Sequence, residues 1–281
     1  MSTRTVALLP AHGDPFNLKY FLNNYQRVWR DDVDDLHVLV SGCPDPEVEA
    51  YARSIVEGVG ARFVGCVGAT MDHGVAMRIL AEHAAEPQHG VNADALVFLE
   101  PDIGVRKAGA IRERLDRILY ARDGGLPDVK VIGSPRISMD GRLDAALVER
   151  WGRRPHGAID GGEGYGLWPC FLFVCAQALL YGTDRDCGAR GWLAGETVEG
   201  PGLLSEDGWC ADTFGSAAIQ LRARSIIEHD VQYKGPYQWS EWLNRGDDVP
   251  WFHTGSLSSW GGAGGLTVDG DSELMDGRRL T

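Results

Sequence analysis

Short apolar runs alternate with helical patterns along the first half of this chain, and this alternation limits the fold more than any other feature. Runs typical of strands buried on both faces occupy residues 6–9, 36–40, 62–64, 95–99 and 129–133. Apolar residues at helical spacing occupy residues 16–29, 46–59, 74–85 and 106–122. Parallel neighbouring strands need a crossover, usually a helix, so this order predicts βαβ units. We therefore expect an α/β fold with a mostly parallel central sheet flanked by helices.

The second half of the chain breaks this rhythm. Residues 140–205 are rich in Gly, Asp and Trp and surround an apolar block at 167–180. A helix is expected over 211–222, followed by a strand over 225–228, and the chain is Gly-rich from Gly255 onwards. A length of 281 residues fits one α/β domain. We divide this domain at residues 1–135, 136–254 and 255–281, the last being a flexible lid or tail.

The composition excludes several classes of partner. A net charge of −13, from 27 basic and 40 acidic residues, disfavours nucleic acid and anionic membrane surfaces. The six cysteines include no C-x-x-C pair, so no zinc module is expected. The N-terminus lacks a signal-peptide pattern, and the apolar run at 167–181 is too short to span a bilayer. We expect a cytoplasmic protein with reduced cysteines and no stable membrane insertion.

Two acidic side chains, Glu100 and Asp102, directly follow the apolar run at 95–99. In parallel α/β sheets, ligands bind outside the carboxyl ends of the strands. Carboxylate oxygens at such a place suit a hard divalent cation, which can bridge to a diphosphate. An Asp102 that only caps the next helix explains the position equally well. Position alone leaves both interpretations open.

The order of these elements, with an apolar strand that ends in an acid-x-Asp pattern, resembles the glycosyltransferase A (GT-A) fold, especially family 2-like enzymes. The resemblance covers residues 6–105 and continues in patches to about residue 253. Asp102 matches the last position of the family's Asp-x-Asp motif, and Glu100 stands at the first. The resemblance implies a single Rossmann-related domain in which Asp102 binds a divalent metal, Mn²⁺ or Mg²⁺, together with the sugar diphosphate.

The same resemblance implies a nucleotide site built from the loops that follow successive strands. Its members in this chain would be Pro10, Ala11, His12, Asp14, Ser41, Gly42, Asp72, Arg78 and Glu100. Plainer interpretations stand beside it. Asp14 and Asp72 fit helix N-caps, and Arg78 fits a surface side chain.

A general base and a further metal ligand are implied by the same family. In inverting members, a carboxylate at a helix start deprotonates the acceptor hydroxyl, which must lie within hydrogen-bond reach. Glu206 and Asp207 match this carboxylate by residue type and Asp212 by its distance to the next strand, although helix capping explains them too. His253 resembles a late histidine that completes the metal shell in several members of the fold. A packed, hydrogen-bonded histidine is the alternative.

Every tryptophan except Trp29 lies beyond residue 150. They are Trp151, Trp168, Trp192, Trp209, Trp239, Trp242, Trp251 and Trp260. Flat aromatic faces stack on the apolar faces of sugars, so two or three of these side chains would suit an acceptor platform. Ordinary core packing explains the others.

We therefore expect a metal-dependent enzyme that acts on a nucleotide-diphosphate sugar of the UDP or GDP type. As a glycosyltransferase, it would bind the nucleotide sugar through residues 1–135 and a small-molecule or glycan acceptor through residues 136–254. One alternative is a nucleotide-sugar mutase that interconverts pyranose and furanose forms, and a second is a non-catalytic nucleotide-sugar binder. A dinucleotide oxidoreductase is disfavoured because no Gly-x-Gly-x-x-Gly follows the first apolar run.

Overall fold

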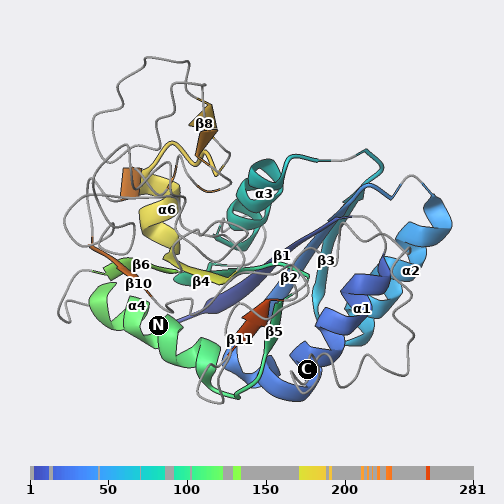
Figure 1. Ribbon diagram of the computed structural model, residues 1–281, viewed down its shortest axis with the longest axis horizontal. Helices are drawn as coiled ribbons and strands as arrows, with labels where there is room; N and C mark the ends of the chain where they lie inside the picture. The colour runs from blue at the N-terminus through green and yellow to red at the C-terminus, as the bar shows by residue number, and fades with distance from the viewer. Residues whose placement is uncertain are drawn as a thin grey trace, which may run out of the picture.

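The computed structural model is built around a seven-stranded sheet with the strand order β10-β6-β7-β4-β1-β2-β3 (Figure 1). The strands of this sheet are β1 (Thr5–His12), β2 (Asp35–Ser41), β3 (Arg62–Val67), β4 (Ala95–Leu99), β6 (Val129–Gly133), β7 (Phe171–Cys175) and β10 (Ile226–His229). The structure describes residues 3–12, 15–43, 45–69, 71–85, 92–101, 103–122, 129–133, 171–187, 190–191, 210–211, 214, 217, 220–221, 226–229 and 251–253.

Helices cover both faces of this sheet (Figure 1). They are α1 (Pro15–Asn24), α2 (Pro46–Gly58), α3 (His73–Ala85), α4 (Ala110–Arg122) and α6 (Ala176–Gly182), with the short π-helix η1 (Tyr25–Trp29) and 3₁₀-helix η2 (Arg30–Asp32) after α1. Helices α3 and α6 pack on one face, and α1, α2 and α4 pack on the other. The fold is therefore a three-layer α/β sandwich, and the expected fold class is confirmed.

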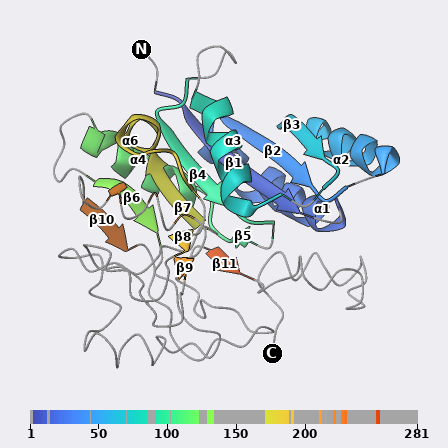
Figure 2. The same cartoon turned by 90° about the horizontal axis from the view of Figure 1, so that it is seen from above.

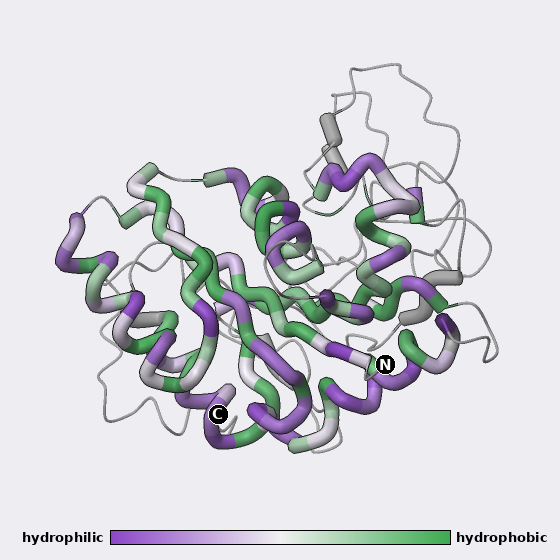
Figure 3. Tube along the Cα trace, turned by 180° about the vertical axis from the view of Figure 1, so that it is seen from behind, coloured by the Kyte–Doolittle hydropathy of each residue, from purple (hydrophilic) through white to green (hydrophobic). Residues whose placement is uncertain are grey.

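The central strand β1 is buried on both faces. Val6 and Leu8 belong to the apolar cluster that contains α3 and α6, whereas Ala7 and Leu9 belong to the cluster that contains α1 and α4. A strand covered by helices on both sides has no polar face, which is why its sequence is a continuous apolar run. Figure 3 shows hydrophobic residues running through the centre of the molecule and hydrophilic ones gathering on the outer helices.

Strand β7 is the one strand of the main sheet that runs in the opposite direction. It pairs antiparallel with both β4 and β6, while the pairs β1–β2, β1–β4, β2–β3 and β6–β10 are parallel. All five residues of β7 are buried. The apolar block expected at 167–180 thus contributes a central strand and then α6, so the second half of the chain enters the middle of the sheet.

Two small ladders lie outside the main sheet (Figure 2). Strand β5 (Ile103–Val105) pairs antiparallel with β11 (Trp251–His253), and β8 (Arg190–Gly191) pairs with β9 (Cys210–Ala211). The helix expected from residue 211 cannot begin there, because Ala211 lies in β9. Helical residues in that region are described at Ala217 and from Gln220 to Leu221.

Three expected element boundaries were also wrong. The first strand does not stop before Pro10 but continues to His12. The ladder between β1 and β4 ends at Leu8, so Pro10 lies where β1 has no β4 partner and its missing N–H is tolerated. The third strand extends from Arg62 to Val67 because its outer residues pair with β2. The helix expected from residue 106 begins at Ala110, after β5.

Candidate functional site

The strand order places a topological switch point between β1 and β4. From β1, the chain moves outward to β2 and β3 on one side, and β4 then lies on the other side of β1. At such a point the crossover helices diverge to opposite faces, which leaves a crevice outside the carboxyl ends of the two strands. The residues that end β1, β2 and β4 therefore define the candidate site.

The ends of β1 and β2 are joined by side chains and backbone. His12 is exposed, and its Nδ1 lies 3.1 Å from Oγ of the buried Ser41. Gly42 follows with a φ of +75°, and its N–H points to the carbonyls of Val67 at 2.9 Å and Ala69 at 3.1 Å. A side chain would be strained in this left-handed conformation, so Gly42 is needed for the close approach of the loops after β2 and β3.

Pro10 and Ala11, which the sequence assigned to the first loop, are buried residues of β1 itself. They pair in register with Leu39 and Val40 of β2. His12 is consequently the exposed end of this strand.

Helix α3 begins beside the end of β4. The Nδ1 atom of His73, the first residue of α3, lies 3.7 Å from Oε1 of Glu100. Asp72 accepts a hydrogen bond from the N–H of Val75 at 3.2 Å, so this carboxylate caps α3 as its plainer interpretation predicted. Arg78 is exposed further along the helix, and its charge acts on Cys187.

Cys187 is not a nucleophile in this environment. Its side chain is buried, and burial raises the pKa of the thiol to about 12. A thiol that stays protonated near neutral pH is a packing residue. Cys43, Cys66 and Cys175 are likewise free thiols.

The chain turns directly after β4 and forms β5 before α4 begins. The N–H of Ile103 donates to the carbonyl of Glu100 at 3.1 Å, and β5 begins at Ile103. Helix α4 is capped from elsewhere, because the carboxylate of Asp32 accepts from the N–H groups of Gly109 at 2.8 Å and Ile111 at 3.1 Å. Helix α4 therefore begins eight residues after Asp102, and Asp32 caps it.

The pairing of β5 with β11 brings two distant parts of the sequence together. In this antiparallel register, Val105 lies opposite Trp251 and Ile103 lies opposite His253. Asp102 is the residue directly before Ile103. The backbone of His253 thus lies opposite Ile103, the residue that follows Asp102, although 150 positions separate Ile103 from His253 in the chain.

Trp251 anchors β11 to the core. Its side chain is fully buried, and its ring stacks on that of Phe171 with centroids 4.8 Å apart and an interplanar angle of 25°. Phe171 is itself opposite Leu99, the last residue of β4. Trp251 is accordingly a core residue, as the plainer interpretation of the tryptophans predicted for part of the set.

Several expected site residues lie outside the described residues: Asp14, Asp102, Glu206, Asp207, Asp212 and all the late tryptophans except Trp251. For His253 only the backbone is described. Among the side chains that the structure does describe, no group of three or more His, Cys, Asp or Glu is arranged to hold a metal ion. The metal site expected from the sequence therefore depends on Asp102 and His253 as ligands.

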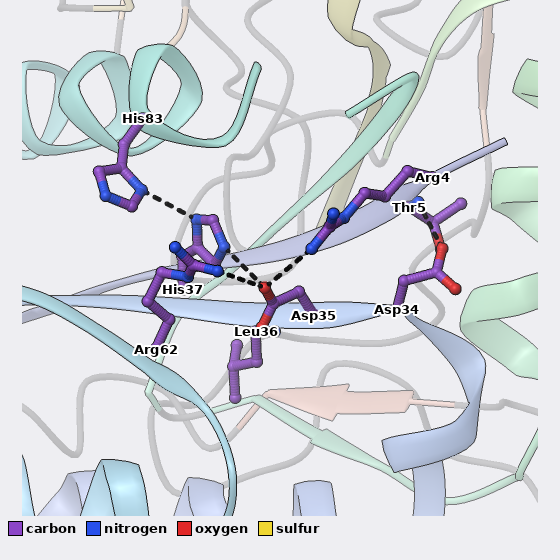
Figure 4. A network of polar contacts seen from close by, with 8 residues as sticks. All are labelled: Arg4, Thr5, Asp34, Asp35, Leu36, His37, Arg62 and His83. Carbon is purple, nitrogen blue, oxygen red and sulfur yellow. Dashed lines mark hydrogen bonds and ion pairs between the residues drawn. The ribbon is translucent and has the colours of Figure 1, made fainter. Parts of the chain in front are cut away.

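A second polar cluster lies at the opposite edge of the sheet, where β1 and β2 begin (Figure 4). The Asp35 carboxylate lies 3.4 Å from Arg4, 3.6 Å from Arg62 and 3.2 Å from Nε2 of the fully buried His37. Nδ1 of His37 in turn lies 3.2 Å from Nδ1 of His83 on α3. Because the carboxylate only accepts hydrogen bonds, His37 donates to it through Nε2. This cluster ties β2 to α3 away from the switch point.

Three residues with long-range contacts were missed by sequence reasoning: His73, Asn24 and Asp32. His73 contacts Glu100 only because α3 lies against the end of β4. Asn24 and Asp32 bind backbone groups 77 to 81 residues away. A polar residue within an apolar helical pattern, such as Asn24, is the single signal that the sequence offered.

No family model and no curated protein matches this chain. Glucosyl-3-phosphoglycerate synthase from Mycobacterium tuberculosis, solved with Mn²⁺, UDP and phosphoglyceric acid, is similar in structure, with 14% identity and a TM-score of 0.43 over 81% of this chain and 68% of that chain. A mannosyltransferase from Pyrobaculum calidifontis, solved with GDP-Man and Mn²⁺, is similar with 12% identity and a TM-score of 0.48 over 82% of this chain and 55% of that chain. Likenesses of this size assign no family to the chain.

Within the described ranges, no helix is long and apolar enough to cross a membrane.

Proposed function

We propose that this protein is a metal-dependent glycosyltransferase that uses a nucleotide-diphosphate sugar of the UDP or GDP type. One observation carries the proposal: the β5–β11 register sets His253 opposite Ile103, the neighbour of Asp102. This juxtaposition lies beside the switch point between β1 and β4, where α/β sheets bind ligands.

The proposed ligands Asp102 and His253 offer one carboxylate and one imidazole. Mn²⁺ accepts both kinds of donor, whereas Mg²⁺ prefers oxygen, so the pair favours Mn²⁺. A divalent ion held there would neutralise the charge that develops on the departing diphosphate. Because the net charge of the protein is −13, a diphosphate needs such a local positive charge in order to bind.

The nucleoside is proposed to lie against the ends of β1 and β2. His12 is the exposed residue of this region and is held by its contact with Ser41, while Gly42 lets the backbone approach the ligand closely. Glu100 and Arg78 complete the proposed donor side, with Glu100 oriented by its contact with His73. Asp72 would act indirectly, by fixing the start of α3.

The acceptor side of the reaction is assigned to the second half of the chain. A carboxylate among Glu206, Asp207 and Asp212 is proposed to accept the proton of the acceptor hydroxyl as that oxygen attacks the anomeric carbon. The hydroxyl oxygen forms the new glycosidic bond with the anomeric carbon, and the bond from that carbon to the diphosphate breaks, so that the nucleoside diphosphate is the leaving group.

Thermal unfolding in the presence of nucleotides tests the donor site. A ligand at about 100 times its Kd stabilises the folded state by about 2.7 kcal/mol, which raises the Tm of a chain of this size by about 5 to 10 °C. We expect this shift with UDP or GDP only when Mn²⁺ is present. Asp102→Ala and His253→Ala should remove it, whereas Asp116→Ala, an exposed carboxylate on α4, should retain it.

Product analysis then separates the enzyme classes. A transferase forms a new glycoside only when an acceptor is added. Rearrangement of the nucleotide sugar alone would instead identify a mutase, and metal-dependent binding without any product would identify a binding protein. If neither nucleotide shifts the Tm with or without Mn²⁺, the proposed function is wrong.

A further inference from the structure

Asn24 is a polar residue in an apolar part of the core. It ends α1, its side chain is 3% exposed, and its neighbours in the apolar cluster include Tyr25 and Trp29. Placing an amide in such surroundings is unfavourable unless its hydrogen bonds are made. The partners of Asn24 therefore indicate why an amide occupies this position.

The Asn24 amide binds the backbone of β5 as a neighbouring strand would. Its Oδ1 accepts from the N–H of Val105 at 2.9 Å, and its Nδ2 donates to the carbonyl of the same residue at 3.0 Å. In a strand, the N–H and C=O of one residue point to the same edge. Asn24 thus covers one edge of β5, while β11 covers the other.

The π-helix after α1 holds this amide in place. Trp29 donates from Nε1 to Oδ1 of Asn24 at 3.0 Å. The two residues are five positions apart, which is the spacing of hydrogen-bonded residues in a π-helix, so the indole of η1 reaches the amide. In the continuous α-helix expected from the sequence, residues with this spacing would point in different directions.

We propose that Asn24 is a positioning residue for the proposed metal site: it fixes β5, and through the β5–β11 register it fixes the backbone of His253 relative to Ile103, the sequence neighbour of Asp102. This inference rests on the proposed function for the metal itself. Strand β5 has three residues and lies outside the main sheet, so few backbone hydrogen bonds hold it. The Asn24 amide makes two hydrogen bonds to β5, both with the backbone of Val105.

Asn24→Leu tests this role, because leucine keeps the branching and the number of heavy atoms of the side chain and removes its hydrogen bonds. Asn24→Asp is the second variant: its carboxylate still accepts from the Val105 N–H but no longer donates to the Val105 carbonyl. Asp32→Asn is the matched control. Asp32 is also a buried residue that binds distant backbone N–H groups, but those groups belong to the start of α4.

Hydrogen–deuterium exchange without metal or nucleotide provides the first readout. Losing buried hydrogen bonds should speed exchange about tenfold to a hundredfold in residues 103–105 and 251–253 of Asn24→Leu. Asn24→Asp should also accelerate exchange in the same residues, because one of its carboxylate oxygens faces the Val105 carbonyl. In Asp32→Asn the acceleration should be confined to the first turn of α4.

Mn²⁺ titration in the presence of UDP and, separately, GDP provides the second readout. The apparent Kd for Mn²⁺ should rise at least about tenfold in Asn24→Leu, as it does when the support of a metal ligand is removed. The apparent Kd for Mn²⁺ should stay unchanged in Asp32→Asn, which would exclude a general loss of stability as the cause of weaker binding in Asn24→Leu.

The inference is overturned if exchange at β5 and β11 is unchanged in both Asn24 variants, or if Asp32→Asn weakens Mn²⁺ binding equally. It is also overturned if the wild-type protein binds Mn²⁺ and Asn24→Leu binds it with the same affinity. A wild-type protein that binds no Mn²⁺ with either nucleotide overturns the proposed function instead, whatever the exchange data show for β5.

Discussion

Replacing Trp251 by alanine tests the tertiary contact on which the proposed site depends. Trp251 is fully buried in the main apolar cluster and stacks on Phe171. Strand β11 contains three residues and, within the described ranges, pairs with β5, and the Trp251 indole attaches it to the core. Removing it should release β11 and, with it, His253.

The expected loss of stability follows from the buried surface. A fully buried aromatic side chain removes on the order of 200 Å² from water, which corresponds to about 5 kcal/mol at about 25 cal/mol per Å². Alanine retains part of this burial, and the cavity collapses in part. We therefore expect the free energy of unfolding to fall by about 3 to 5 kcal/mol, a large share of the stability of a typical domain.

Urea unfolding followed by far-UV circular dichroism measures this difference, because the other tryptophans of the chain obscure a fluorescence signal. Tyr120→Ala is the control: that aromatic residue is 67% exposed, and its loss should change stability by less than about 0.5 kcal/mol. Trp251→Phe should recover most of the loss, since phenylalanine retains a ring against Phe171. A loss below about 1 kcal/mol in Trp251→Ala would refute the core position of Trp251 and remove the observation that carries the proposed function.

Two further predictions concern the opposite edge of the sheet and the end of α2. Burial raises the pKa of the Asp35 carboxyl, but the hydrogen bond and charge of His37, the charge of Arg62 and a backbone N–H outweigh it, so the pKa lies below 3.8. Because the folded-state pKa is depressed, the ionised Asp35 carboxylate stabilises the folded state above about pH 4, and this contribution is lost as the pH falls through the lowered pKa. The midpoint of urea unfolding should therefore fall as the pH is lowered through this range. In Asp35→Asn the midpoint should depend less on pH at the acidic end. Gly60 has a φ of +75°, so Gly60→Ala should lower the free energy of unfolding by about 1 to 2 kcal/mol. Gly58 lies in the last turn of α2, and no atom lies within 4 Å of a Cβ added there, so Gly58→Ala should raise the free energy of unfolding by about 0.5 to 1 kcal/mol. Equal effects of the two variants would contradict the assigned backbone conformations.

The sequence predicted those elements whose cause is local. Helix α2 begins at Pro46, as expected, and the Asp45 carboxylate before it accepts from the N–H of Glu47 at 2.8 Å. Strand β4 coincides with the apolar run at 95–99 because a strand buried on both faces needs an apolar side chain at every position. The alternation of such runs with helices was sufficient to predict the parallel order of the first strands.

The sequence also indicated which residues to examine at the ends of these strands, because a parallel sheet gathers those ends at one edge. Ser41, Gly42 and Glu100 do lie at that edge. Their contacts were not predictable, since the partner of each comes from a different element. Glu100 faces His73, for example, only after α3 has packed against the sheet.

Tertiary structure alone decided the remaining features. The reversed strand β7 enters between β4 and β6 because its apolar residues complete both faces of the core, and nothing in its own sequence fixes its direction. Asp32 caps α4, and Asn24 binds one edge of β5. Buried backbone groups must be hydrogen-bonded, and any suitable side chain that the fold brings near can serve as the partner. The sequence determined the layers of this protein through local periodicity, whereas long-range pairing decided which distant residues share the candidate site.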